Sequence, residues 1–220
     1  MIEIERHGHV AVVRWADGEN RFHRSSVVRW HQVMDELEAV EGPLAVVVAG
    51  EGKFFSNGLD LDSFAAEPDD MGFVVGEVHR LFGRMLLLPA YVAGALNGHT
   101  FAAGAMLACC FDTRVMREDR GFWCLPEADL AIPLTEPMFA TVMARLPVAV
   151  AAEAMNTGRR YPGPEALGVG LVEHLAAEDQ VLAKALELAD RVATKDRRVI
   201  GTHKRMLFSD VARTCGHVPD

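Results

Sequence analysis

Two glycine-punctuated segments could do chemistry through their backbones. They are residues 52–60 and 97–106, and each follows a short apolar run that we expect to be a buried strand and precedes an expected helix. The amino end of a helix presents unpaired N–H groups and the positive end of its dipole. Two such ends side by side could hold a carbonyl oxygen that becomes negative during a reaction, because Gly58, Gly98 and Gly104 leave room beside the backbone. The alternative is that these glycines serve only tight turns and close packing.

Side chains that commonly carry metals, nucleophiles or nucleotides show no matching pattern. His7, His9, His23 and His31 have no metal-ligand spacing with nearby Cys or Asp, so we expect no metal. The four cysteines include no CxxC pair and are expected to be reduced packing residues of an intracellular protein. No GxSxG elbow, Walker loop or dinucleotide fingerprint is present.

The segments that would position the two loops alternate between strands and helices. The patterns predict strands at residues 2–6, 9–15, 44–49, 91–96, 113–116, 122–125 and 171–174. They predict a short helical turn after the loop 50–62 and helices at about 27–37, 70–88, 102–110, 135–145, 148–156, 181–192 and 197–211. This alternation predicts an α/β fold with substantial parallel pairing. We expect a core domain over residues 1–156 and a helical C-terminal extension over residues 157–220, which would cover the site or mediate oligomerisation.

Composition excludes several classes of partner. The 220 residues are 50% hydrophobic, and 22 Lys plus Arg against 31 Asp plus Glu give a net charge of −9. No stretch combines basic with aromatic residues, so neither nucleic acid nor an anionic membrane is an expected partner. The apolar stretch 85–111 is broken by Pro89 and by polar residues 97–100, which favours strand, turn and helix over a membrane span. With no targeting signal in view, we expect a soluble, cytoplasmic protein.

Five motifs resemble those of one known family. They are residues 54–61 (FFSNGLDL), 95–104 (ALNGHTFAAG), 110–122 (CFDTRVMREDRGF), 125–130 (LPEADL) and 168–173 (GVGLVE). Together they resemble the crotonase superfamily, also called the enoyl-CoA hydratase/isomerase family, from about residue 2 to about residue 210. Residues 18–22, 56–58 and 116–122 look most similar to plant-type Δ3,Δ2-enoyl-CoA isomerases.

This resemblance implies a crotonase-type spiral of ββα repeats that assembles into a homotrimer or a dimer of trimers. It also implies acyl-CoA thioester substrates, with coenzyme A as part of the substrate and no separate cofactor. Two backbone amides, carried over by position to Leu59 and Ala103, would form an oxyanion hole for the thioester enolate. The neighbouring residues expected to line the substrate site are Asn57, Gly58, Gly104 and Met106.

The number of carboxylates distinguishes the reactions of this family. Its hydratases use two glutamates, and here the first position is Met106 while the second is Glu127. Hydration requires activating a water and delivering a proton, work usually shared by two groups, and methionine can do neither. Moving a double bond from C3–C4 to C2–C3 needs one base and an oxyanion hole. The resemblance therefore predicts an enoyl-CoA isomerase with Glu127 as its base.

The residues around Glu127 predict that its carboxyl group has a raised pKa and is therefore a stronger base. Apolar residues precede it at 122–125 and follow it at Leu130, Ile132 and Leu134, and an apolar pocket raises the pKa of a carboxyl group. The alternative is that Glu127 is an exposed loop acid. Two other functions stay open: a hydratase with a substitute partner such as Glu136, and a catalytically silent acyl-CoA binder.

The CoA phosphates would need cations despite the negative net charge. The candidates are Arg21 or Arg24, Lys53, and the pair Lys204-Arg205. His99 is a candidate for lining the acyl pocket.

Overall fold

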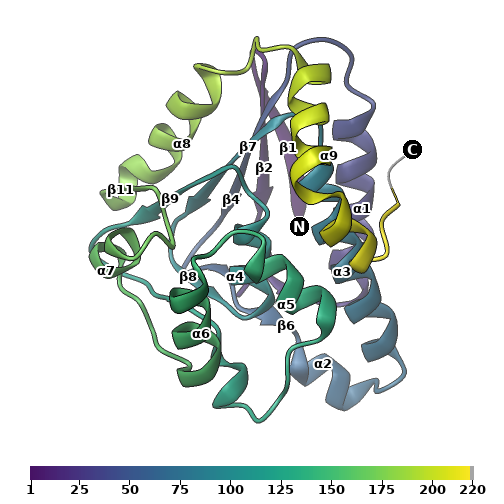
Figure 1. Ribbon diagram of the computed structural model, residues 1–220, viewed down its shortest axis with the longest axis vertical. Helices are drawn as coiled ribbons and strands as arrows, with labels where there is room; N and C mark the ends of the chain where they lie inside the picture. Colours follow the sequence, from purple (N-terminus) through teal and green to yellow (C-terminus); the bar gives the residue numbers. More distant parts are fainter. Residues whose placement is uncertain (219–220) are drawn as a thin grey trace.

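A six-stranded sheet runs through the centre of the computed structural model, which describes residues 1–218 (Figure 1). The strand order is β1-β2-β4-β7-β9-β11, and only β1 is antiparallel to its neighbour. The strands are β1 (Ile2–His7), β2 (Val10–Trp15), β4 (Ala45–Gly50), β7 (Tyr91–Leu96), β9 (Thr113–Arg117) and β11 (His174–Ala176). In β4 the residues Val46, Val47 and Val48 are all buried, as expected for a parallel strand that is covered on both faces.

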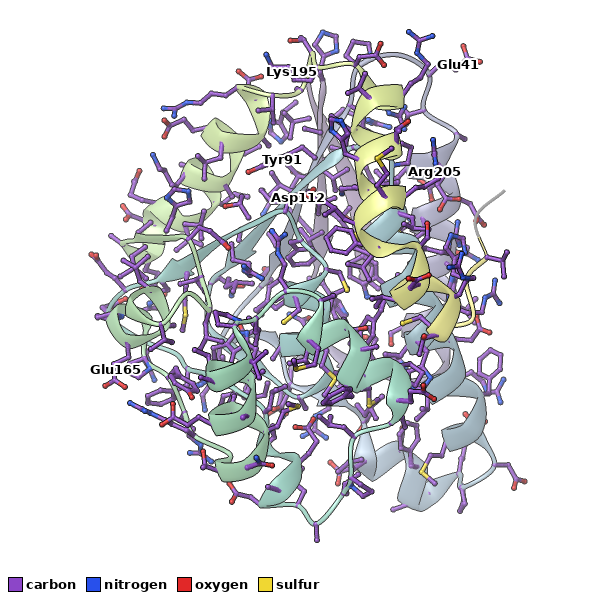
Figure 2. All side chains as sticks on the ribbon, viewed as in Figure 1. Glu41, Tyr91, Asp112, Glu165, Lys195 and Arg205 are labelled. Atoms are coloured by element: carbon purple, nitrogen blue, oxygen red, sulfur yellow. The ribbon has the colours of Figure 1, made fainter. Side chains whose placement is uncertain are left out.

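Helices cover both faces of this sheet. α1 (Arg24–Glu38), α3 (Asp70–Leu87) and α9 (Arg197–Thr214) lie on one face, and α8 (Val181–Asp190) lies on the other (Figure 1). Because side chains alternate along a strand, Val13 packs into the core beneath α1 while Val12 packs into the core beneath α8. Side chains fill the space between these layers (Figure 2).

Two small sheets lie beyond the carboxyl end of the central sheet. One has the order β10-β8-β5 and is parallel throughout, with β5 (Phe54–Ser56), β8 (His99–Phe101) and β10 (Trp123–Cys124). The other pairs β3 (Arg21–Phe22) with β6 (Gly58–Leu59). The sequence predicted only β10 among these five strands. Two or three residues carry too little alternation to be recognised, and such strands form because neighbouring strands supply their hydrogen bonds.

The remaining helices pack around the small sheets. They are α2 (Leu61–Ala66), α4 (Ala103–Cys109), α5 (Glu136–Met143), α6 (Val148–Thr157) and α7 (Gly163–Gly168), with 3-10 turns η1 (Pro126–Ala128) and η2 (Glu178–Gln180). The predicted helices agree with these to within a few residues, except that α7 was not predicted. The predicted last strand at 171–174 is displaced: Leu171 and Val172 are buried against the core, while the pairing with β9 starts at His174.

The expected division at residue 156 does not coincide with a break in packing. β11 completes the central sheet, and Ala185 of α8 and Phe208 of α9 belong to the two apolar cores. Residues 157–218 are therefore integral to the fold rather than an appendage. No helix within residues 1–218 is long and apolar enough to cross a membrane.

Candidate active site

Three adjacent parallel strands end at the same edge of the small sheet. β5 leads into Gly58 and Leu59, β8 leads into Ala103 at the start of α4, and β10 leads into η1, which contains Glu127. Neighbouring strands lie about 4.8 Å apart, and the carboxyl ends of parallel strands are a common place for ligand sites. The topology therefore places the two predicted oxyanion amides and the predicted base at one edge, with the β8–α4 connection in the middle.

The amide of Ala103 is the first of the helix α4. The first amides of a helix have no partner within it, and in α4 the bonding starts with Met106, whose amide donates to the carbonyl of Ala102. Ala102 has φ 50° and ψ −127°, a left-handed conformation that is strained for a residue with a Cβ. Its amide donates to the Cys124 carbonyl over 3.0 Å, which ties this turn to the strand that leads to Glu127.

The amide of Leu59 lies on an unpaired edge of β6. In the parallel pairing with β3, the carbonyl of Phe22 accepts from the amide of Asp60, the residue directly after Leu59. Parallel pairing uses alternate residues, so the amide of Leu59 points away from β3. No other strand within residues 1–218 pairs with β6, and α4 packs against it. The Leu59 amide is therefore available on the side where α4 lies.

Gly58 brings the two loops into contact. A Cβ at this position would lie 2.7 Å from the Cβ of Ala102 and 3.1 Å from the nitrogen of Ala103, and Gly58 itself has φ +81°. Gly104 serves packing in the same region, since a Cβ there would lie 2.6 Å from the Cβ of Ser56. Gly58 faces the turn that carries the Ala103 amide, so it has the role expected of a glycine in the site. Gly104 faces Ser56, so it serves close packing.

Glu127 is half-buried, and one oxygen of its carboxyl group is fully buried. Its Oε2 atom has no hydrogen-bond partner, and burial raises the pKa of the group to about 7, against the weaker opposing effect of a backbone hydrogen bond. This agrees with the predicted apolar pocket. The enclosure differs from the prediction, however: Leu125 is fully buried, whereas Leu130 and Ile132 are 49% and 43% exposed. α6 packs against η1 and covers the segment that carries Glu127.

The unsubstituted protein should lose stability as the pH rises, because Glu127 ionises, and Glu127→Gln should abolish this pH dependence. The folded pKa of about 7 lies above the ordinary 4.5, so the folded protein keeps a proton that the unfolded chain releases between these values. The resulting stability is fully present below pH 4.5 and is lost as the pH rises through 7. From about pH 5 to about pH 8, the unfolding free energy of the unsubstituted protein should fall by about 2–3 kcal/mol relative to the variant. Urea unfolding of both proteins across this range measures the difference, and parallel pH profiles would contradict it.

The other candidates for acid–base work are placed differently. Met106 is fully buried within the core, on the helix that starts at the Ala103 amide. Glu136 is exposed in the first turn of α5. His99 lies at the first position of β8, the end of that strand opposite to Ala103, so it is not placed beside the oxyanion amides. Within residues 1–218 no cluster of three His, Cys, Asp or Glu side chains could hold a metal ion.

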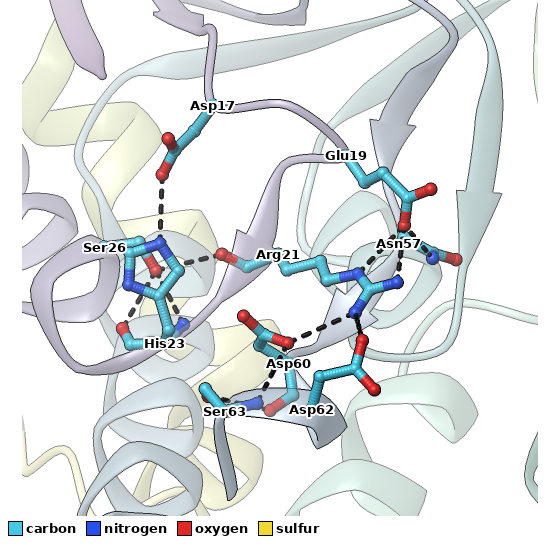
Figure 3. A network of polar contacts seen from close by, with 9 residues as sticks. All are labelled: Asp17, Glu19, Arg21, His23, Ser26, Asn57, Asp60, Asp62 and Ser63. Atoms are coloured by element: carbon cyan, nitrogen blue, oxygen red, sulfur yellow. Dashed lines mark hydrogen bonds and ion pairs between the residues drawn. The ribbon is translucent and has the colours of Figure 1, made fainter. Parts of the chain in front are cut away.

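Arg21 belongs to a network of carboxylates rather than to a free cationic site (Figure 3). Its guanidinium pairs with Glu19 at 2.7 Å, Asp62 at 2.7 Å and Asp60 at 3.2 Å, and these carboxylates raise the pKa of Arg21. Asn57 joins the network by donating from Nδ2 to Glu19 over 2.7 Å. Because three carboxylates surround one guanidinium, the prediction that Arg21 holds a CoA phosphate is not supported. The network instead fixes the 57–62 segment that carries Leu59.

Lys204 is also unavailable to a phosphate. It is only 4% exposed, pairs with Asp112 at 2.7 Å and donates to the Ala90 carbonyl over 2.8 Å, so it anchors α9 to the central sheet (Figure 2 labels Asp112). Burial lowers the pKa of Lys204. Arg24 is exposed and paired with Asp70, whereas Arg205 is exposed at α9. Lys53 is exposed at the amino end of β5, the end opposite to Leu59.

Comparisons with solved structures define the class of fold. A probable enoyl-CoA hydratase from Mycobacterium tuberculosis H37Rv superposes with a TM-score of 0.91, covering 98% of this chain and 91% of the other at 22% sequence identity. An enoyl-CoA hydratase from Bacillus anthracis superposes with a TM-score of 0.87, again at 22% identity, covering 98% of this chain and 87% of the other. This chain therefore has the same fold as these two proteins.

Sequence comparisons identify the family. The profile of the enoyl-CoA hydratase/isomerase family matches residues 5–216. Enoyl-CoA delta isomerase 2, peroxisomal, of Arabidopsis thaliana is 30% identical over 98% of this chain and 95% of its own length. A putative enoyl-CoA hydratase of Thermus thermophilus is 33% identical over 95% of this chain and 84% of its own length. This chain belongs to the enoyl-CoA hydratase/isomerase family.

Proposed function

We propose that this protein is an enoyl-CoA isomerase that shifts the double bond of a 3-enoyl-CoA to give the 2-enoyl-CoA. One observation carries the proposal: the carboxyl group of Glu127 has a raised pKa and one buried oxygen without a partner, and it follows the same sheet edge as the amides of Leu59 and Ala103. The resemblance to plant-type isomerases, one of which is 30% identical, supports the same reaction.

The proposed mechanism uses one side chain and two amides. The ionised Glu127 takes a proton from C2 of the thioester, and the electron pair moves onto the thioester oxygen to form a dienolate. The amides of Leu59 and Ala103 donate hydrogen bonds to that oxygen while the negative charge is present. Glu127 then returns the proton at C4, which leaves the double bond between C2 and C3. A positioned base contributes about 10²–10⁴-fold to such a reaction, and each oxyanion donor about 10²–10³-fold.

A hydratase is the second candidate, because the relative from Thermus thermophilus carries that name. Hydration would need a second acid–base group near Glu127. Met106 stands at the position of that group in the family's hydratases, and Glu136, the predicted substitute, is exposed. A catalytically silent acyl-CoA binder is the third candidate. The raised pKa of Glu127 argues against it, because an uncompensated buried carboxyl group costs stability and tends to persist where it is used.

A three-way assay tests the proposal. The purified protein is offered a 3-enoyl-CoA and, separately, a 2-enoyl-CoA, and the products are separated by chromatography. We expect 2-enoyl-CoA from the first substrate and little 3-hydroxyacyl-CoA from the second. Dominant formation of the 3-hydroxyacyl product would favour the hydratase, and binding without turnover would favour the silent binder.

We also propose the assembly that the family resemblance implies, a homotrimer or a dimer of trimers. Large apolar side chains such as Met206, Leu207 and Val148 are 69–81% exposed in the single chain, and a second copy would cover such surface. Light scattering should give three or six times the chain mass of 24.1 kDa. The cytoplasm remains the predicted compartment, although the Arabidopsis relative is named as peroxisomal.

A further inference from the structure

A second group of chemically active side chains lies on the small sheet, outside the proposed reaction. Four rings pack together there: the rings of Phe54, Phe101 and Phe122 lie 5.2, 5.0 and 5.6 Å from the ring of His99. Cations border them, with Lys53 over Phe54 at 5.4 Å and Arg160 over Phe101 at 5.8 Å. We term these residues, together with Arg120, the cation–aromatic cluster.

A cavity of about 460 Å³ adjoins this cluster. It lies between the carboxyl ends of β4, β7 and β9, represented by Gly50, Asn97 and Arg117, and the amino ends of β5 and β8, represented by Lys53 and His99. Since β5 and β8 each have three residues at about 3.3 Å per residue, the cavity is about 10 Å from the edge that carries the oxyanion amides. The cavity and the proposed thioester site are therefore at opposite ends of the same short strands.

The charges around the cavity leave unpaired cations. Arg117 is neutralised by Asp119 and Glu178. Lys53, Arg120 and Arg160, in contrast, form no ion pair with any residue in 1–218, and the remaining carboxylate of the lining is that of Glu51. The positive charges of Lys53, Arg120 and Arg160 also lower the pKa of His99, after the larger effect of burial, so all three lie near its ring. Three unpaired positive charges therefore lie close together here, although the chain has a net charge of −9.

Polar atoms without hydrogen-bond partners line the same space. The backbone amides of Gly52, Gly98 and Gly121 donate no hydrogen bond within the described part of the chain. The Nδ1 atom of His99 is buried and has no partner. Backbone amides can only donate, so free amides beside the unpaired Lys53 and Arg120 indicate a missing acceptor. The Oδ1 atom of Asn97 is also buried without a partner, so polar atoms of both kinds in this lining lack partners within the described residues.

We propose that this cavity is a second ligand site that binds a multiply charged phosphate group, separate from the thioester site. A single carboxylate would be satisfied by one arginine fork, whereas the unpaired Lys53 and Arg120 of the lining, the free amides and a space of 460 Å³ suit a phosphate or a phosphoanhydride. Lys53 serves this site rather than the CoA phosphates. The inference is independent of which reaction Glu127 performs.

Calorimetric titration with inorganic pyrophosphate at low ionic strength tests the site. The double variant Lys53→Gln/Arg120→Gln should bind pyrophosphate at least tenfold more weakly than the unsubstituted protein. The matched control Arg6→Gln/Lys195→Gln removes the same charge from exposed positions outside the cavity lining and should change the affinity less than twofold. Equal weakening in both double variants, or no binding to the unsubstituted protein, would overturn the proposal.

Two further measurements define the site. The ring signals of His99 in the NMR spectrum should shift on pyrophosphate addition, and this shift should be absent in the cavity variant, whose circular dichroism verifies folding. A saturating acyl-CoA should leave pyrophosphate binding unchanged, because displacement would show that the cavity belongs to the thioester site and would refute a separate one. Titration with ADP identifies the source of the phosphate: tighter binding than pyrophosphate supports a nucleotide, and equal binding supports the free anion.

Discussion

Glu127→Gln is expected to lower kcat for the isomerisation of a 3-enoyl-CoA by about 10²–10⁴-fold, with little change in substrate affinity. Glutamine keeps the size of the side chain but cannot accept the C2 proton. The activity of the unsubstituted protein should rise with pH and level off above about 7, because only the ionised carboxylate acts as a base and burial raises its pKa to about 7. Steady-state kinetics from about pH 5 to about pH 9 measure both effects.

Glu136→Gln is the matched control for this substitution. It removes an exposed carboxylate from the first turn of α5 and should leave kcat within about twofold. Full activity of Glu127→Gln, or a comparable loss in Glu136→Gln, would contradict the assignment of Glu127 as the base.

Gly58→Ala should have the second-largest effect, through the oxyanion hole. The new Cβ would lie 2.7 Å from the Cβ of Ala102, so the 57–59 loop or the Ala102 turn must move and the two amides would separate. Misplacing one oxyanion donor costs about 10²–10³-fold in kcat. The φ of +81° adds strain for alanine, and we expect a loss of about 1–3 kcal/mol in unfolding free energy.

Gly42→Ala separates backbone strain from the clash. Gly42 has nearly the same φ, +80°, but an added Cβ would meet nothing within 4 Å. This variant should lose some stability and keep its kcat. If both variants lose the same activity, the effect arises from general destabilisation, and the proposed contact between the loops is not what positions the amides.

Some features of the site were predictable from local sequence. The long helices α3 and α9 and the buried strands β4 and β7 have clear periodicity, and the family motifs identified Leu59, Ala103 and Glu127 by position. The short strands β3, β5, β6 and β8 were not predictable in this way. They matter most for the site, because β5 and β8 with β10 bring the three segments to one edge.

The roles of the charged residues depended on partners far along the chain. Arg21 is paired with Asp60, 39 residues away, and Lys204 donates to the Ala90 carbonyl, 114 residues away. Neither pairing has a local signature, so both residues looked like free cations in the sequence. The sequence put Lys53 beside the first loop, but the extended strand β5 lies between Lys53 and Leu59 and holds them apart.

The sequence by itself determined the α/β alternation, because that follows from short-range periodicity, and the family, because its motifs are local. That Met106 stands where the family's hydratases have a glutamate is what the resemblance implies. Only the tertiary structure decided that one carboxyl oxygen of Glu127 is buried without a partner, that the two glycine loops touch at Gly58, and that the unpaired cations gather around His99. Burial and electrostatics depend on every group within a few ångströms in space. In a fold whose strands are joined by long crossovers, those groups come from distant parts of the chain.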